Sequence, residues 1–246
     1  HPGDGTDSNI SRKNEKNSLN KAKEIGIDPT YIYADINEGW KISVFISEFR
    51  EPDYNSFKDS KKIISVLRKL HGSGIKVDYG MDPWKDSLKI EKLLRKKAPE
   101  CFEKNEKLKR KIELLYKKTA GDGVEKCFCH GDTYKSNWMI KPDGNVILID
   151  WEYSGYSDPG IDVGYYIVDA MYDFDEAERF IKEYLQDSYT EKRYYHFWAY
   201  TAIIAYYWYV WALYRESCGA VMGDALINWR DMAEKYADHI LDCEGE

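Results

Sequence analysis

Apolar positions recur at two spacings along the chain, and each spacing predicts one type of element. From residue 57 to 71 they follow a helical period that ends at Gly72. Residues 31–36 and 41–46 are short apolar-rich runs on either side of a turn signal, which predicts two strands. Further helices are predicted at 9–24, 162–172, 175–186, 190–217 and 222–241 and in the basic stretch 85–118 with a break at Pro99, and loops at 79–84 and 154–159.

A second strand pair is predicted between residues 138 and 149. The apolar runs 138–141 and 146–149 flank the sequence PDGN, a dense turn signal, so they should form an antiparallel hairpin. A four-residue turn would place Asn137 opposite Asp150, with their Cβ atoms about 5 Å apart. An amide oxygen beside a carboxylate gives two of the hard oxygen ligands that Mg²⁺ takes.

The loop before this hairpin carries the remaining candidate chemistry. His130, Asp132 and Asn137 have the spacing H-x-D-x-x-x-x-N of kinase catalytic loops, in which the Asp is the base and the Asn holds metal. Asp150 stands where kinases place a second metal-binding Asp. Each residue alone is more often a turn cap, a buried histidine or a strand end. All four at these spacings favour a phosphoryl-transfer site.

Net charge and cysteine content exclude several classes of protein. The net charge of −7 argues against a general binder of nucleic acid or of anionic membranes. The 5 cysteines are scattered, and Cys127-x-Cys129 has no second pair at zinc-finger spacing. We therefore expect a reduced, cytoplasmic protein with neither a disulfide framework nor zinc.

Aromatic residues are abundant, with 21 Tyr and 8 Trp, and many lie in the uncharged run 197–214. A helix of that length could just span a bilayer. Its Tyr and Trp residues occur throughout, whereas a spanning helix carries them at its two ends. A buried helix, without membrane insertion, is the prediction.

Several stretches together resemble the choline kinase and aminoglycoside phosphotransferase group. PGDGTDSNISRKNE resembles the segment that leads into the Glu-bearing helix of the small lobe, and VFISEF resembles the hinge between lobes. WEYSGYSDPGIDVGYYIVDAMYDF resembles the choline kinase signature, and YYWYVWALY the late helix that supplies two tryptophans to the choline pocket. The resemblance implies an α+β, protein-kinase-like fold of two lobes. Residues 1–48 would be part of a small N-terminal lobe and 49–246 a mainly helical C-terminal lobe.

The resemblance also implies the roles of individual residues in an ATP-dependent, Mg²⁺-dependent kinase. Asp132 would be the catalytic base, and His130 would support the catalytic loop. The family's glycine-rich loop and the basic residue of its third strand would precede residue 1. The other implied roles are metal binding for Asn137, Asp150 and Glu152, nucleotide binding for Glu15, Phe45, Ile46 and Glu48, and choline binding for Tyr153, Asp169, Trp208 and Trp211.

Choline is favoured as substrate on physical grounds as well. A quaternary ammonium donates no hydrogen bond and is recognised by aromatic faces. Trp208 and Trp211 are three residues apart on one predicted helix, and Trp229 on the next helix would be a third wall. An ethanolamine kinase, an aminoglycoside kinase or a catalytically silent choline-binding relative stay open as alternatives. A polyamine substrate would be met by Asp158, Asp162, Asp169 and Asp173.

Overall fold

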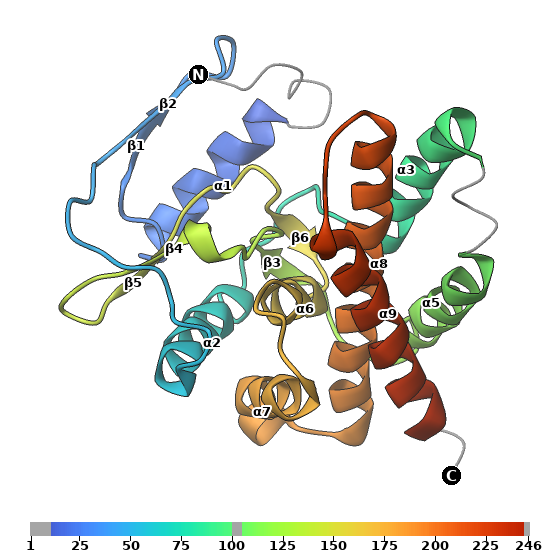
Figure 1. Cartoon of the computed structure of the whole chain (residues 1–246). Coiled ribbons are helices and arrows are strands. Elements are labelled where there is room, and N and C mark those ends of the chain that lie inside the picture. Colours follow the sequence, from blue (N-terminus) through green and yellow to red (C-terminus); the bar gives the residue numbers. More distant parts are fainter. Residues whose placement is uncertain (1–10, 100–104, 244–246) are drawn as a thin grey trace. The chain divides into compact units, whose positions relative to one another are not determined.

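The computed structural model describes residues 11–99 and 105–243 (Figure 1). The chain packs into two compact units, and each is made of two separate stretches of sequence. Unit 1 contains the described residues up to Met81 together with Lys126–Asp162, and unit 2 contains Asp82–Glu125 and the residues from Val163 onward. These units concern packing only, and the division into lobes after residue 48 stays a prediction.

Unit 1 begins with a helix and a short hairpin. Helix α1 (Arg12–Glu24) starts where the Ser11 side chain accepts a hydrogen bond from a first-turn amide, while the predicted start at residue 9 lies outside the described residues. Strands β1 (Tyr31–Ala34) and β2 (Lys41–Ser43) pair antiparallel and are shorter than predicted. The Asp35 carboxylate accepts two backbone N–H groups of the following turn, which ends β1 at Ala34.

Helix α2 (Phe57–His71) confirms the prediction from periodicity, including its end at Gly72. Its apolar stripe is buried inside unit 1, and the side chains that form the stripe are Ile63, Ile64, Leu67 and Leu70.

Two further strand pairs surround the predicted catalytic loop. Strands β4 (Trp138–Ile140) and β5 (Val146–Leu148) form the predicted hairpin, preceded by the one-turn 3₁₀ helix η2 (Lys135–Asn137). Strands β3 (Cys127–Cys129) and β6 (Gly155–Ser157) pair antiparallel, although 154–159 was predicted as a loop. Both are three residues long, too short to show a period in the sequence.

The hairpin register differs from the prediction by one residue. Trp138 pairs with Leu148, and Lys141 donates its N–H to the carbonyl oxygen of Asn145, which leaves a loop of the residues 142–144. Within it, Gly144 has a φ of 88°. This is the hairpin loop that a left-handed glycine closes. The backbone oxygen of Asn137 therefore accepts a hydrogen bond from the backbone N–H of Ile149, and the predicted pairing of Asn137 with Asp150 is wrong. A shift by one residue turns a strand's side chains to the opposite face.

Unit 2 is helical and organised around α8 (Glu191–Ser217), which packs against several other helices of the unit. Figure 1 shows α9 running beside α8, as the contacts between the two helices require. Helix α3 starts at Pro83, inside the predicted loop 79–84, because Asp82 caps it. Helix α3 spans Pro83–Lys97. The remaining α-helices lie close to their predicted ranges and are α5 (Glu106–Thr119), α6 (Gly160–Asp169, whose first residues belong to unit 1), α7 (Phe174–Leu185) and α9 (Asp224–Cys243). The short 3₁₀ helix η3 (Gln186–Ser188), which follows α7, was not predicted as a separate element.

Most of the aromatic run of α8 is buried within unit 2. Gly164 of α6 permits close approach, because a Cβ atom there would lie 3.1 Å from the backbone of Thr201. Within residues 11–99 and 105–243, none of the helices combines the length and the apolar character that crossing a membrane requires.

Candidate active site

The predicted catalytic loop begins directly after β3 and is fixed by His130. The His130 side chain is fully buried, and its Nδ1 accepts a hydrogen bond from the backbone N–H of Asp132 at 3.2 Å. Nε2 therefore carries the proton that His130 donates to the carbonyl oxygen of Ile149, 2.9 Å away. Gly131 has a φ of 81°, and a Cβ atom there would lie 2.5 Å from the carbonyl oxygen of Tyr153. Glycine is thus required both by conformation and by space.

Asp162, at the start of α6, holds the same loop from the other side. Its carboxylate accepts hydrogen bonds from the backbone N–H groups of His130 at 2.8 Å and Gly131 at 2.7 Å. One of its oxygens also lies 2.9 Å from Nε2 of His71. Burial alone would raise the pKa of Asp162, but the hydrogen bond and charge of His71 outweigh it and lower the pKa.

Sequence reasoning missed this positioning role. The sequence indicated Asp162 only as a carboxylate for a polyamine substrate, yet Asp162 is fully buried and its oxygens accept hydrogen bonds from the loop. Asp173, considered for the same purpose, caps α7 through a capping box with Glu176. Nothing in the sequence around Asp162 marks this role, because the N–H groups that it accepts belong to a loop 31 and 32 residues earlier.

Asp132 and Asn137 lie together, as their spacing predicted. Nδ2 of Asn137 donates to the backbone oxygen of Asp132 at 2.9 Å and to its carboxylate Oδ2 at 3.0 Å. The amide is oriented by these two bonds, so its oxygen is the atom left to act as a ligand. Asp132 itself is half-buried, which suits a group that must exchange a proton with a bound molecule.

Asp150 lies in an acidic cluster with Glu15 and Glu152. Each of the three offers a carboxylate oxygen within 4.8 Å of the others. Asp150 has a φ of 69°, an uncommon conformation for a residue other than glycine and one that ends the strand. Hard oxygen donors at this spacing fit Mg²⁺. Burial, followed by the charges of Asp150 and Glu15, raises the pKa of Glu152.

Two basic residues offset this negative charge, and neither was predicted to belong to the site. Lys41, the first residue of β2, donates to Oε1 of Glu15 and to Oδ1 of Asp150, each at 2.9 Å. Arg12 of α1 lies 3.2 Å from Glu15 and 3.9 Å from Glu152. Burial lowers the pKa of Lys41, but the charge of Asp150 and the hydrogen bond to Glu15 outweigh burial and raise the pKa. The unused signal for Lys41 was a lysine at the start of a predicted strand, next to a turn.

The remaining predicted residues of unit 1 lie at its surface. Tyr153 is exposed, and burial of its hydroxyl group, together with the charges of Glu152 and Asp132, raises its pKa. In the predicted hinge, Phe45 and Glu48 are exposed and Ile46 is half-buried.

The predicted tryptophans come together within unit 2. Trp208 and Trp211 of α8 are edge-to-face, with ring centroids 5.3 Å apart, and Trp229 of α9 lies 5.7 Å from Trp208. Tyr165 of α6 meets Trp208 edge-to-face at 5.1 Å. The three tryptophans and Asp169 are half-buried. The guanidinium of Arg215 lies 5.4 Å from the Trp211 ring, so this ring already faces one cation.

A hairpin behind an H-x-D-x-x-x-x-N loop, a helix-borne glutamate paired with a lysine, and a large helical part define a protein-kinase-like phosphotransferase. The chain belongs to the APH family, described as the phosphotransferase enzyme family, which it matches over residues 55–199. This confirms the predicted family and the prediction of a phosphotransferase enzyme.

Solved structures agree on the fold. The chain is similar to choline kinase LicA from Streptococcus pneumoniae, with 27% identity, a TM-score of 0.80, and coverage of 97% of this chain and 84% of that chain. A choline/ethanolamine kinase family protein from Mesorhizobium loti matches with 20% identity, a TM-score of 0.75, and coverage of 96% and 80%. An aminoglycoside phosphotransferase from Alicyclobacillus acidocaldarius matches with 12% identity, a TM-score of 0.60, and coverage of 96% and 82%. The predicted α+β, protein-kinase-like fold is confirmed.

Proposed function

We propose that this chain transfers the γ-phosphate of ATP to the hydroxyl group of choline, giving phosphocholine and ADP. The observation that carries the choice of choline is the cluster of Trp208, Trp211 and Trp229 in unit 2. Aromatic faces attract a quaternary ammonium by about 0.5–2 kcal/mol each. The similarity to a choline kinase at 27% identity supports the same choice, and the solved complex of that kinase with AMP supports nucleotide binding.

Asp132 is the base in this proposal. It accepts the proton of the choline hydroxyl as the oxygen attacks phosphorus in line, and the proton then rests on its carboxyl group. The amide of Asn137, donating to Oδ2 of Asp132, fixes the orientation of this carboxylate. His130 and Asp162 keep the loop backbone in place through the bonds described above.

Asn137, Asp150 and Glu152 would hold Mg²⁺, which offsets the charge of the transferred phosphoryl group when bound. Glu15 orients Lys41, which in turn meets phosphate charge. Phe45, Ile46 and Glu48 border the adenine, largely through backbone atoms. Tyr153 and Asp169 are the other residues that this proposal assigns to choline.

A coupled ADP-release assay across choline, ethanolamine and an aminoglycoside tests the proposal with the full-length protein. We expect turnover to be greatest with choline, because the other two substrates gain little from an aromatic cluster. Preference for ethanolamine or for the aminoglycoside would assign the chain to another branch of the family. Choline binding without ADP release would identify a catalytically silent relative.

The role of Asp132 is tested separately. Asp132→Asn should lower kcat by about 10²- to 10⁴-fold, the usual contribution of a general base, while choline affinity stays nearly unchanged. Asp187→Asn, at an exposed position of unit 2, is the matched control and should retain full activity. Near-normal turnover by Asp132→Asn would remove Asp132 from the role of base.

A further inference from the structure

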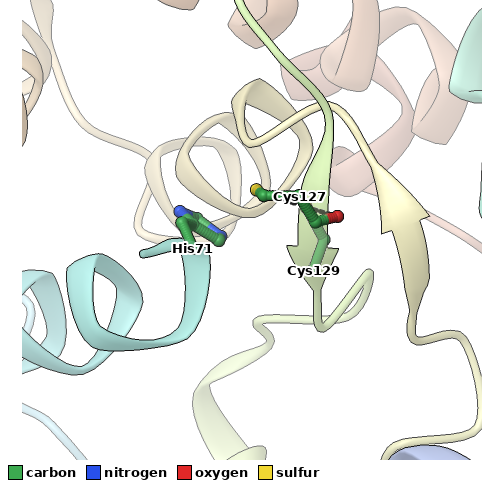
Figure 2. A group of neighbouring side chains, drawn as sticks. All are labelled: His71, Cys127 and Cys129. Carbon is green, nitrogen blue, oxygen red and sulfur yellow. Dashed lines mark hydrogen bonds between the residues drawn. The ribbon is translucent and has the colours of Figure 1, made fainter. Parts of the chain in front are cut away.

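Two thiols and an imidazole converge in unit 1, and the proposed phosphoryl transfer uses none of them. Figure 2 shows Cys127 and Cys129 on β3 and His71 at the end of α2, with the sulfur of Cys127 directed toward the imidazole ring. Each residue offers a ligand atom, and these atoms all lie within 4.8 Å of one another. The segments are distant in sequence, so the convergence is a product of the fold.

The two thiols are closer together than their positions in the strand require. Residues i and i+2 point to the same face of a strand, and a rise of about 3.3 Å per residue separates them by about 6.6 Å. The Sγ atoms of Cys127 and Cys129 nevertheless lie 3.6 Å apart. Two thiolates bound tetrahedrally to one Zn²⁺ at about 2.3 Å each are about 3.8 Å apart. The thiols therefore have almost the spacing that a shared metal would impose.

The imidazole is oriented as metal-binding histidines are. Nε2 of His71 lies 2.9 Å from the carboxylate of Asp162, and a metal would bind the ring through Nδ1. A carboxylate behind the second ring nitrogen fixes the tautomer and the ring plane of a metal ligand. Asp162 holds the catalytic loop through its bonds to His130 and Gly131, so the two features share this one carboxylate.

Burial and charge also suit a cation. Cys129 and the side chain of His71 are buried, whereas Cys127 is partly buried, so an ion would enter past Cys127. Two thiolates balance the charge of one divalent cation, and the anionic Asp162 lies behind the ring. Soft thiolate and imidazole donors favour Zn²⁺ over the hard Mg²⁺.

We propose that His71, Cys127 and Cys129 bind one thiophilic divalent cation of the Zn²⁺ class, with a water molecule as fourth ligand. Binding releases the two thiol protons to solvent and forms two metal–sulfur bonds and one metal–nitrogen bond. Sequence reasoning expected no zinc because it looked for a second cysteine pair, whereas the third ligand comes from an earlier helix. The proposal is independent of the nucleotide site and of the proposed substrate.

The test is a titration of the reduced full-length protein with Co²⁺ and then Zn²⁺, in buffer containing excess Mg²⁺. We expect one equivalent of Co²⁺ to produce thiolate-to-cobalt charge-transfer absorption and the visible absorption of a tetrahedral site. One equivalent of Zn²⁺ should remove both. Absence of these bands, or displacement of Co²⁺ by Mg²⁺, would overturn the proposal.

Variants assign the ligands. Cys127→Ser, Cys129→Ser and His71→Asn should each lose the tetrahedral spectrum or weaken Co²⁺ binding, while Cys218→Ser, which changes an exposed thiol in unit 2, should keep both. Equal spectra in all four variants would place the ion elsewhere. If a variant fails to fold, alkylation of the wild-type protein tests the proposal instead. Zn²⁺ should protect two thiols from alkylation, and peptide masses should identify them as Cys127 and Cys129. Protection of other cysteines, or of none, would overturn the proposal.

Discussion

At the scale of single residues, the placement of Lys41 changes the proposed nucleotide site most. Its ammonium lies between Glu15 and Asp150, 2.9 Å from an oxygen of each, although Lys41 and Asp150 are 109 residues apart. Without it, the cluster of three carboxylates would meet the phosphates of a nucleotide with much less compensating charge. A lysine in this position therefore both orders the acidic cluster and lowers its repulsion of phosphate.

Replacing Lys41 tests this role. Lys41→Met should raise the KM for ATP or lower kcat, reducing kcat/KM by about 10- to 100-fold, the equivalent of about 1.5–3 kcal/mol for one hydrogen bond between charged groups. Steady-state kinetics with ATP as the varied substrate would measure the effect. Lys21→Met, which removes an exposed ion pair of α1 with Glu24, is the control and should change little. Unchanged kinetics in Lys41→Met would mean that its two ion pairs are structural.

For Asp150, the sequence predicted the residue's position but not its neighbours. Its type and its place after the second hairpin strand were evident in the sequence, but the register was not, because one residue of loop length decides it. The structure pairs Ile149 with Asn137 and turns Asp150 into a left-handed conformation beside Glu15. No local pattern encodes that turn.

Among the elements, α8 carries the substrate prediction. Trp211 stands edge-to-face with Trp208, and Arg215 one turn later lies over its ring. Trp211→Ala should raise the KM for choline by about 2- to 30-fold, the equivalent of 0.5–2 kcal/mol for one cation–π contact, with little effect on the KM for ATP. Kinetics with each substrate varied would separate the two. Tyr189→Ala, at an exposed aromatic outside the cluster, is the control. An unchanged KM for choline would assign Trp211 to packing.

The connector between β2 and α2 is held by an ion pair. Arg50 exchanges two backbone hydrogen bonds with Ile140 of β4, at 3.0 and 2.8 Å. Its guanidinium donates to both oxygens of Asp59, which also accepts the backbone N–H of Asp53. The hydrogen bond from Arg50 lowers the pKa of Asp59, although burial acts in the opposite direction. The ion pair therefore ties the connector to α2, and the two backbone hydrogen bonds tie it to the hairpin of β4 and β5.

Asp59→Asn should lower the free energy of unfolding by about 1–3 kcal/mol at neutral pH. Because the folded protein depresses the pKa of Asp59, the ionised carboxylate stabilises above the ordinary value of 3.8 and the stabilisation is lost as pH falls through the folded pKa. Urea unfolding of both proteins between pH 7 and pH 3 would show the difference shrinking. Asp78→Asn, at an exposed position of unit 1, is the control. A difference that stays constant over this range would exclude the charge as its cause.

At the scale of the whole molecule, the chain passes between the two units three times, after Met81, Glu125 and Asp162. Neither unit is a continuous segment, so neither can be completed without the stretch that builds part of the other. We expect one cooperative unfolding transition for the whole chain.

Core substitutions in either unit test this cooperativity. Ile63→Ala in unit 1 and Phe180→Ala in unit 2 each remove a fully buried side chain, at a cost of about 2–5 kcal/mol. Both should shift the whole transition, as measured by far-ultraviolet circular dichroism and by tryptophan fluorescence in parallel. Two separate transitions, of which each variant moves only one, would show that the units unfold independently.

The sequence by itself determined the features that depend only on residues close together in the chain. The period of α2, the turn that closes β4 and β5, and the spacing of His130, Asp132 and Asn137 are local patterns, and the structure retains each of them. Short elements such as β3 and β6 escaped prediction, because three residues carry no measurable period.

Only the tertiary structure decided which distant groups share a charge or a hydrogen bond. It placed Lys41 against Asp150, buried Asp162 against the predicted catalytic loop, and brought His71 to the thiols of β3. These contacts join segments tens of residues apart, and their energies depend on distance and burial after folding. A spacing along the chain cannot contain that information.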